Sequence, residues 1–230
     1  MIAALTLAAS PGSAWAQSPP YAPPQNVLQL SATGTVEVQQ DLLSLNLTAS
    51  RDGADANAVQ GQLKMALDAA LTEARRTALP GQLDVRTGNF ALYPRYSQGG
   101  RFSAWQGTAE LVLEGRDFAR ITQAAGRIQS MTLGGVSFGL SREQRARVEA
   151  DAQSMAIDRF KAKAAELARG FGFSGYSLRE VSVQTNDQGF PRPVRMMTAE
   201  AKSAQADMAV PVEAGKSTVV VTVSGTVQLR

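Results

Sequence analysis

The chain of 230 residues contains no histidine and no cysteine. Histidine is the usual proton carrier near neutral pH, and both residue types are common nucleophile partners and transition-metal ligands. Their absence excludes a Ser-His-Asp triad, a Cys-His pair, a thiolate or imidazole metal site, a haem held by histidine and any disulfide. Only carboxylate, lysine, tyrosine or terminal-amine chemistry remains. We therefore expect a protein that is not an enzyme, with no catalytic, cofactor-binding or metal-binding residue.

Long apolar runs are also scarce. A short one at residues 2–9 is followed by the helix-breaking pair Pro11 and Gly12 and then by Ala14-Trp15-Ala16, the pattern of small residues that signal peptidase reads. We predict a signal peptide at residues 1–16 and a periplasmic mature chain that begins at Gln17. The alternative for this run is a short buried segment. No other segment has the length and apolarity of a transmembrane helix.

Neither positive nor negative charge dominates the sequence. Charged residues make up 19% of the chain, the formal net charge is +3, and the arginines are spread among 20 acidic residues. This mixture is typical of an ordinary solvated surface, so we expect no nucleic-acid partner.

Alternating apolar and polar residues predict antiparallel strands. The pattern is clean at 27–38 and 42–50, and again at the end of the chain at 216–229. Further strands are predicted at 82–96, 101–115, 136–140 and 176–185, with a hairpin turn at 97–100. One polar face and one apolar face per strand indicate a sheet covered on one side only.

Helices are predicted by apolar residues at three- and four-residue spacing. These helices cover about 55–76, a short stretch from Asp117, and a long stretch from Ser141 through Phe171. Ser141 and Gln144 match the capping box that begins a helix. The buried stripe expected on the long helix consists of Val148, Ala152, Met155, Ala156, Phe160, Ala164, Leu167 and Phe171.

The order of these elements repeats. Strand-helix-strand-strand occurs at 42–115 and again at 136–230, which predicts an α+β fold of duplicated units, with helices packed on one face of antiparallel sheet. We expect a single domain at 27–230, a Pro-rich flexible leader at 17–26 and a flexible segment at 186–215. The first and last strands are long and poor in Lys and Pro, so we expect them to be sheet edges that need covering.

Two motifs are misleading. The sequence 135–139 matches the G-x-S-x-G nucleophile elbow, but Ser137 has no histidine base and fits a strand interior. The sequence 170–175 matches G-x-G-x-x-G, yet it follows a helix C-terminus, where the negative dipole end repels a pyrophosphate. A glycine cap and turn explain it better.

Four aromatic residues around the predicted hairpin are the candidate ligand or interface surface: Tyr93, Tyr96, Phe102 and Trp105. The alternative for Trp105 is that its ring fills the core.

Several short motifs occur together in the order typical of one family. They are Gly34 and Asp41, Tyr93-Pro94-Arg95-Tyr96, Val136-Ser137-Phe138-Gly139-Leu140-Ser141, Ala152 and Ala156, Lys161-Ala162-Lys163-Ala164, Leu167-Ala168, Phe171-Gly172, and the residues 211–216. Taken together they resemble the SIMPL-domain family of bacterial periplasmic proteins, which includes the periplasmic immunogenic and oxidative-stress defence proteins. Gln40, where the family usually has Pro, and Phe160, where a small residue is usual, depart from the pattern.

The resemblance implies a periplasmic α+β protein that is assembled from several copies and linked to envelope or oxidative stress, with no established active site. Our first hypothesis is therefore a non-enzymatic, self-assembling homo-oligomer. The alternative is a monomeric periplasmic module that binds a peptide or small ligand, with the aromatic hairpin as its platform.

Overall fold

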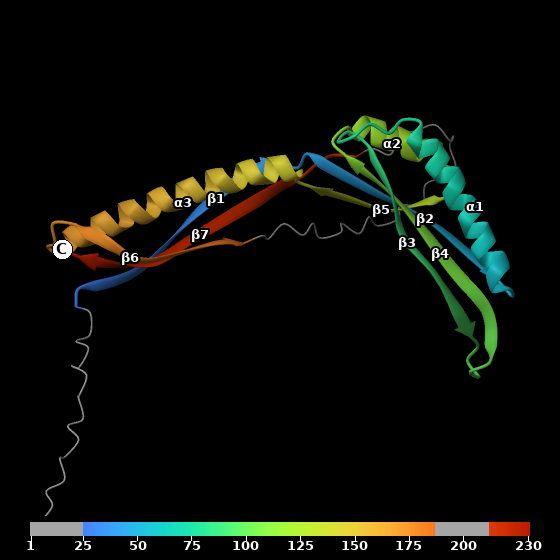
Figure 1. Ribbon diagram of the computed structural model, residues 1–230, viewed down its shortest axis with the longest axis horizontal. Coiled ribbons are helices and arrows are strands. Elements are labelled where there is room, and N and C mark those ends of the chain that lie inside the picture. The colour runs from blue at the N-terminus through green and yellow to red at the C-terminus, as the bar shows by residue number, and fades with distance from the viewer. Residues whose placement is uncertain (1–24, 187–211) are drawn as a thin grey trace, which may run out of the picture.

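The computed structural model describes residues 25–186 and 212–230, which form two lobes joined end to end (Figure 1). The predicted signal peptide, most of the Pro-rich leader and most of the predicted flexible segment lie outside the described residues. The described part contains three helices and seven strands, and the strands form two antiparallel sheets. The expected α+β fold with antiparallel sheet is confirmed.

The four-stranded lobe contains the first two helices. Its elements in chain order are β2 (Leu42–Gly53), α1 (Ala56–Arg75), β3 (Asp84–Tyr96), β4 (Phe102–Gly115), α2 (Phe118–Arg127) and β5 (Thr132–Gly139). The strands lie in the order β3-β4-β2-β5, and α1 and α2 pack on one face. The alternating leucines of β2, with Leu111 and Leu113 of β4, are fully buried beneath the helices.

The three-stranded lobe is built around one long helix. It contains β1 (Val27–Gln39), α3 (Arg142–Gly170), β6 (Tyr176–Asn186) and β7 (Lys216–Leu229), with the strands in the order β1-β7-β6. The core between helix and sheet combines small residues of α3, such as Ala152 and Ala156, with the valines of β7. A Cβ at Gly34 would overlap the backbone of Ala152, so glycine lets α3 approach β1 closely.

The helix ends follow the residues that predict them. Asp55, Asp117 and Ser141 are the three N-caps. The Ser141 hydroxyl accepts a hydrogen bond from the Gln144 N–H, which is one half of the predicted capping box, whereas the Ser141 N–H donates to the Asp41 carboxylate and not to the Gln144 side chain. At the end of α3 the N–H of Phe173 donates to the Ala168 carbonyl, and Gly172 adopts φ +82°. The G-x-G-x-x-G match is therefore a glycine cap and turn, as predicted.

Some details differ from the expected stripe and edges. Phe171 is 64% exposed, because it is the C-cap of α3 and no longer follows the helical phase, whereas Ala168 is buried. Met155 and Leu167 are half-buried. The prediction that the last strand is an edge is wrong, since β7 pairs with β1 on one side and with β6 on the other.

The two repeated units exchange one strand each, which the sequence pattern did not predict. The orders β3-β4-β2 and β6-β7-β1 correspond, and each pair of C-terminal strands follows its helix in sequence. However, β5, which the sequence places first in the second unit, pairs with β2, and β1 from the N-terminal end takes its place beside β7. Each lobe is thus completed by a strand from the other half of the sequence.

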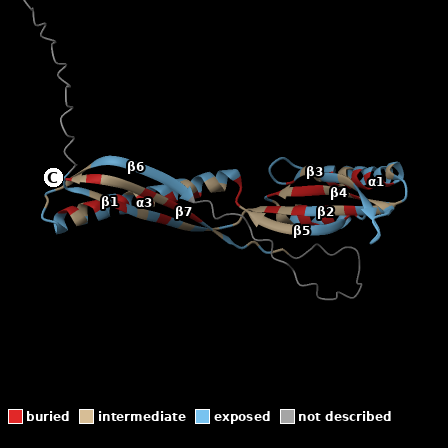
Figure 2. Cartoon of the chain, turned by 90° about the horizontal axis from the view of Figure 1, so that it is seen from below, coloured by how far each residue is buried: buried red, intermediate tan, exposed pale blue. Residues whose placement is uncertain are grey.

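Burial is uneven across the strands. Buried residues concentrate along β2, β4 and α1 in one lobe and along β7 and α3 in the other (Figure 2). In contrast, no residue of β3 is buried, nor is any residue of β6 from Tyr176 to Thr185. Both are edge strands of their sheets, and α3 makes most of its contacts with β1 and β7.

Candidate functional site

A cluster of hydrogen bonds joins the two lobes, and its centre is Asp41. The Asp41 carboxylate accepts hydrogen bonds from the Ser141 N–H (2.7 Å) and the Ser141 hydroxyl (2.6 Å). The Asp41 N–H donates to the Gly139 carbonyl at 3.1 Å. Arg116 adds an ion pair, with its Nε 3.5 Å from Asp41 Oδ2. These hydrogen bonds hold together two connections that run between the lobes, the one from β1 to β2 and the one from β5 to α3.

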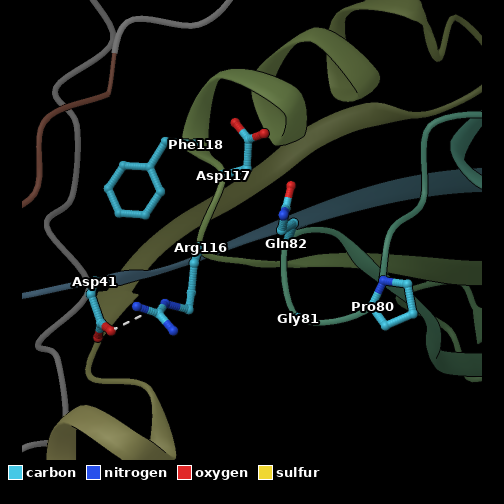
Figure 3. A pocket seen from close by; sticks show the side chains of 7 residues that line it. All are labelled: Asp41, Pro80, Gly81, Gln82, Arg116, Asp117 and Phe118. Atoms are coloured by element: carbon cyan, nitrogen blue, oxygen red, sulfur yellow. Dashed lines mark ion pairs between the residues drawn. The ribbon is translucent and has the colours of Figure 1, made fainter.

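A pocket of about 720 Å³ lies beside this cluster. Figure 3 shows the Arg116 guanidinium turned toward Asp41, while the Asp117 carboxylate points away from this pair. The residues that line the pocket are Asp41, Pro80, Gly81, Gln82, Arg116, Asp117 and Phe118.

Both carboxylates of the pocket are already engaged. Asp41 is held by Ser141 and Arg116, and Asp117 caps α2 by accepting a hydrogen bond from the Arg120 N–H at 3.0 Å. That backbone hydrogen bond is the main reason why the pKa of Asp117 lies below its ordinary value, with the Arg120 side chain adding to the effect. Carboxylates in these roles stabilise the fold, and the lowered pKa of Asp117 is the opposite of the raised pKa that a general acid needs.

The four aromatic residues predicted as a surface are only partly brought together. The rings of Tyr96 and Phe102 lie 6.5 Å apart, and those of Phe102 and Trp105 lie 5.8 Å apart. Tyr93 pairs with Gln106, one position out of phase with the Pro94–Trp105 pair, so its side chain lies on the opposite face of the hairpin.

These rings differ in exposure. Tyr93 is 57% exposed, Tyr96 63% and Phe102 50%. Trp105 is half-buried: its ring packs against the core of the four-stranded lobe and also contacts Phe102. The hairpin is a surface cluster of three rings, with a fourth on the reverse side.

The remaining motif singled out in the sequence, the G-x-S-x-G match around Ser137, forms part of the sheet. Ser137 lies inside β5, opposite Ser44 of β2, as the strand interpretation predicts. Within the described residues there is no group of three or more acidic side chains arranged to hold a metal ion. None of the described helices has the length and apolarity to cross a membrane.

Comparison with known families identifies the chain. The model for the SIMPL domain, described as a protein of unknown function (DUF541), matches residues 28–227. The chain belongs to the SIMPL family. No significant match exists among curated proteins. In this SIMPL chain, Asp41 and Ser141 are hydrogen-bonded to each other although 100 positions separate them in sequence.

Sequence reasoning missed one surface of this SIMPL protein. Leu178, Val181 and Val183 of β6 are 54%, 45% and 46% exposed. Their pairing with β7 places all three on the face that carries α3, since the partners are Val227, Gly225 and Val223. They form an apolar strip beside α3, which we call the β6 strip. The alternation of 176–185 predicted the strand, but not that the helix leaves this strand uncovered.

Proposed function

We propose that this SIMPL protein is a non-enzymatic, self-assembling protein of the bacterial periplasm, serving envelope or oxidative-stress defence. The compartment and the stress role are supported by the resemblance of its motifs to periplasmic SIMPL proteins and by the pattern of residues 1–16. Self-assembly is supported by the β6 strip, and this strip is the observation on which the proposal depends.

An edge strand with an apolar face invites pairing with another strand. Among the strands that the structure describes, β6 pairs only with β7, so the backbone N–H and C=O groups on its other side have no strand partner there. Its first half is blunted by a bulge between Leu178 and Glu180 and by the charges of Arg179 and Glu180. Its second half, 181–186, has neither a charged residue nor a proline. We therefore assign the contact between copies to this second half.

A second copy is the occupant that fits best. Antiparallel pairing of two β6 strands would extend two three-stranded sheets into one continuous sheet and bring Val181 and Val183 of each copy together beside the two α3 helices. The apolar side chains would be removed from water, which is worth about 25 cal/mol for each Å² buried. Two-fold pairing of this kind closes on itself and leaves no free β6 edge.

The double variant Val181→Lys/Val183→Lys tests this contact. Both side chains are exposed in the single chain, so the lobe should still fold, but four like charges would meet in the paired strands. We expect light scattering of the exported protein at micromolar concentration to give a multiple of the chain mass, and the variant to give a smaller species with an unchanged circular dichroism spectrum.

Met65→Lys is the matched control, because Met65 is 67% exposed on α1, in the other lobe. Its mass should equal that of the unmodified protein. A monodisperse monomer in the unmodified protein, at high concentration, contradicts self-assembly and favours the monomeric binding module. An unchanged oligomer in the double variant shows that the contact lies elsewhere.

A further inference from the structure

The hairpin of β3 and β4 extends beyond the rest of its sheet. β2 pairs with β4 only as far as Gly53, which lies opposite Trp105, whereas β3 and β4 continue together to the pair Tyr96 and Phe102. The last turn of the hairpin is therefore a two-stranded ribbon, which projects at one end of the molecule (Figure 1). We call residues 93–105 the ribbon tip.

The ribbon tip has an unusual composition. Four of the chain's aromatic residues (8 Phe, 4 Tyr and 2 Trp) lie within it. It also contains Arg95 and Arg101, and the sequence has no acidic residue from Asn89 to Thr108. Arg95 is 3.8 Å from Asp52 of β2, and Arg101 is exposed at the turn. Aromatic rings interleaved with arginine are typical of segments that enter the boundary between lipid headgroups and acyl chains.

The arrangement of the rings argues against a stacking platform for sugars or bases. Such a platform needs flat, parallel rings on one face, but the Tyr96 and Phe102 rings are inclined by 84° and those of Phe102 and Trp105 by 57°. Tyr93 lies on the reverse face. Tyr96 and Phe102 on one face of the projecting ribbon, together with Tyr93 on the opposite face at its base, form a wedge whose two sides can contact the same medium.

We propose that the ribbon tip binds an anionic membrane surface. Tyr93, Tyr96 and Phe102 enter the headgroup region, where aromatic rings partition well, and Arg101 attracts the lipid phosphates, whereas Arg95 also pairs with Asp52. The Gly99-Gly100 turn, in which Gly100 has φ +72°, leaves no bulky side chain at the extreme end of the wedge. This surface lies in the four-stranded lobe, on elements other than the β6 strip, so the proposal does not depend on self-assembly.

Trp105 provides a direct probe of this surface. The chain has two tryptophans, and the other is Trp15 in the predicted signal peptide. The change Trp15→Phe removes the other tryptophan whether or not the signal peptide is cleaved. All tryptophan fluorescence of this protein then comes from Trp105, which contacts Phe102. We expect a blue shift on addition of vesicles made of equal parts phosphatidylglycerol and phosphatidylcholine, and co-sedimentation of the protein with them. Pure phosphatidylcholine vesicles and high salt should weaken both signals.

The decisive variant is Tyr96→Ser/Phe102→Ser. Both rings are at least half exposed, so their removal leaves the core intact. We expect its vesicle affinity to fall at least about tenfold, since two side chains no longer leave water. The matched control is Phe171→Ser, an equally exposed aromatic residue of the other lobe, whose vesicle affinity should not change.

Three results would overturn the proposal. The first is the absence of binding to the anionic vesicles, and the second is binding that the Tyr96→Ser/Phe102→Ser variant retains in full. The third is a fall in the solution mass of this variant without lipid, because this would show that the ribbon tip contacts another copy of the chain. Self-assembly through β6 predicts an unchanged mass for this variant, so the two proposals fail separately.

Discussion

The replacement Gly34→Ala tests the close approach of α3 to β1. A Cβ at this position would lie 2.8 Å from the Ala156 nitrogen and 3.0 Å from the Ala152 carbonyl carbon, and it would overlap the Ala152 oxygen still more deeply. These are backbone atoms in the middle of α3, so no side-chain rotation can relieve the clash. Either the helix or the strand must move by about 1 Å or more.

The loss of stability caused by that movement depends on what α3 and β1 each contact. Lifting α3 loosens its contacts with Val221 and Val223 of β7, which are fully buried. Moving β1 instead strains its ladder with β7, which runs the length of the strand. Overpacking of this kind costs about 3 kcal/mol, and the reduced freedom of the unfolded chain with alanine returns less than about 1 kcal/mol. We expect a net loss of at least about 2 kcal/mol.

Urea unfolding monitored by circular dichroism measures this loss, and amide hydrogen exchange locates it. Exchange should accelerate in α3 and β1 and remain unchanged in α1, because the two lobes have separate cores. The control is Gly61→Ala in α1, where a Cβ meets nothing within 4 Å and the helix should gain up to about 1 kcal/mol. A Gly34→Ala protein as stable as the unmodified one would refute this account of the packing of α3.

Local patterns predicted the elements and their buried faces well. The alternation in 42–50 places Leu43, Leu45 and Leu47 on one face, and all three are buried. The helical spacing in 55–76 places Val59 and Leu63 on one face, and both are buried as well. In both cases the periodicity of one element decides which side chains share a face, so neighbouring sequence is sufficient.

Pairing between distant segments could not be predicted in this way. Both β1 and β5 have the alternation of a strand, and nothing in either pattern states that they exchange sheets. The Asp41 and Ser141 contact likewise joins residues from different lobes, and only the spatial meeting of two connections creates it. Sequence reasoning found the aromatic residues of the ribbon tip, but the β6 strip arises from where α3 happens to lie.

Two further replacements probe the helix caps and the lobe connection. Asp117→Ala should lower the Tm at neutral pH. Because the pKa of Asp117 is depressed in the folded protein, the stabilisation by this carboxylate is present above the ordinary pKa of 3.8 and is lost as the pH falls through the folded pKa. The difference in Tm between the variant and the unmodified protein should therefore become smaller in acid. Asp41→Asn retains the shape of the side chain but removes its charge and leaves only one acceptor oxygen for the two donors of Ser141. Because this carboxylate also meets Arg116, we expect a loss of about 2 kcal/mol and faster amide exchange at Ser141, measured by mass spectrometry. Ser141→Ala is the control, since it removes one of the same hydrogen bonds and the helix cap, and it should accelerate exchange at the start of α3. Unchanged exchange at Ser141 in the Asp41→Asn protein would show that the lobes are held together without this carboxylate.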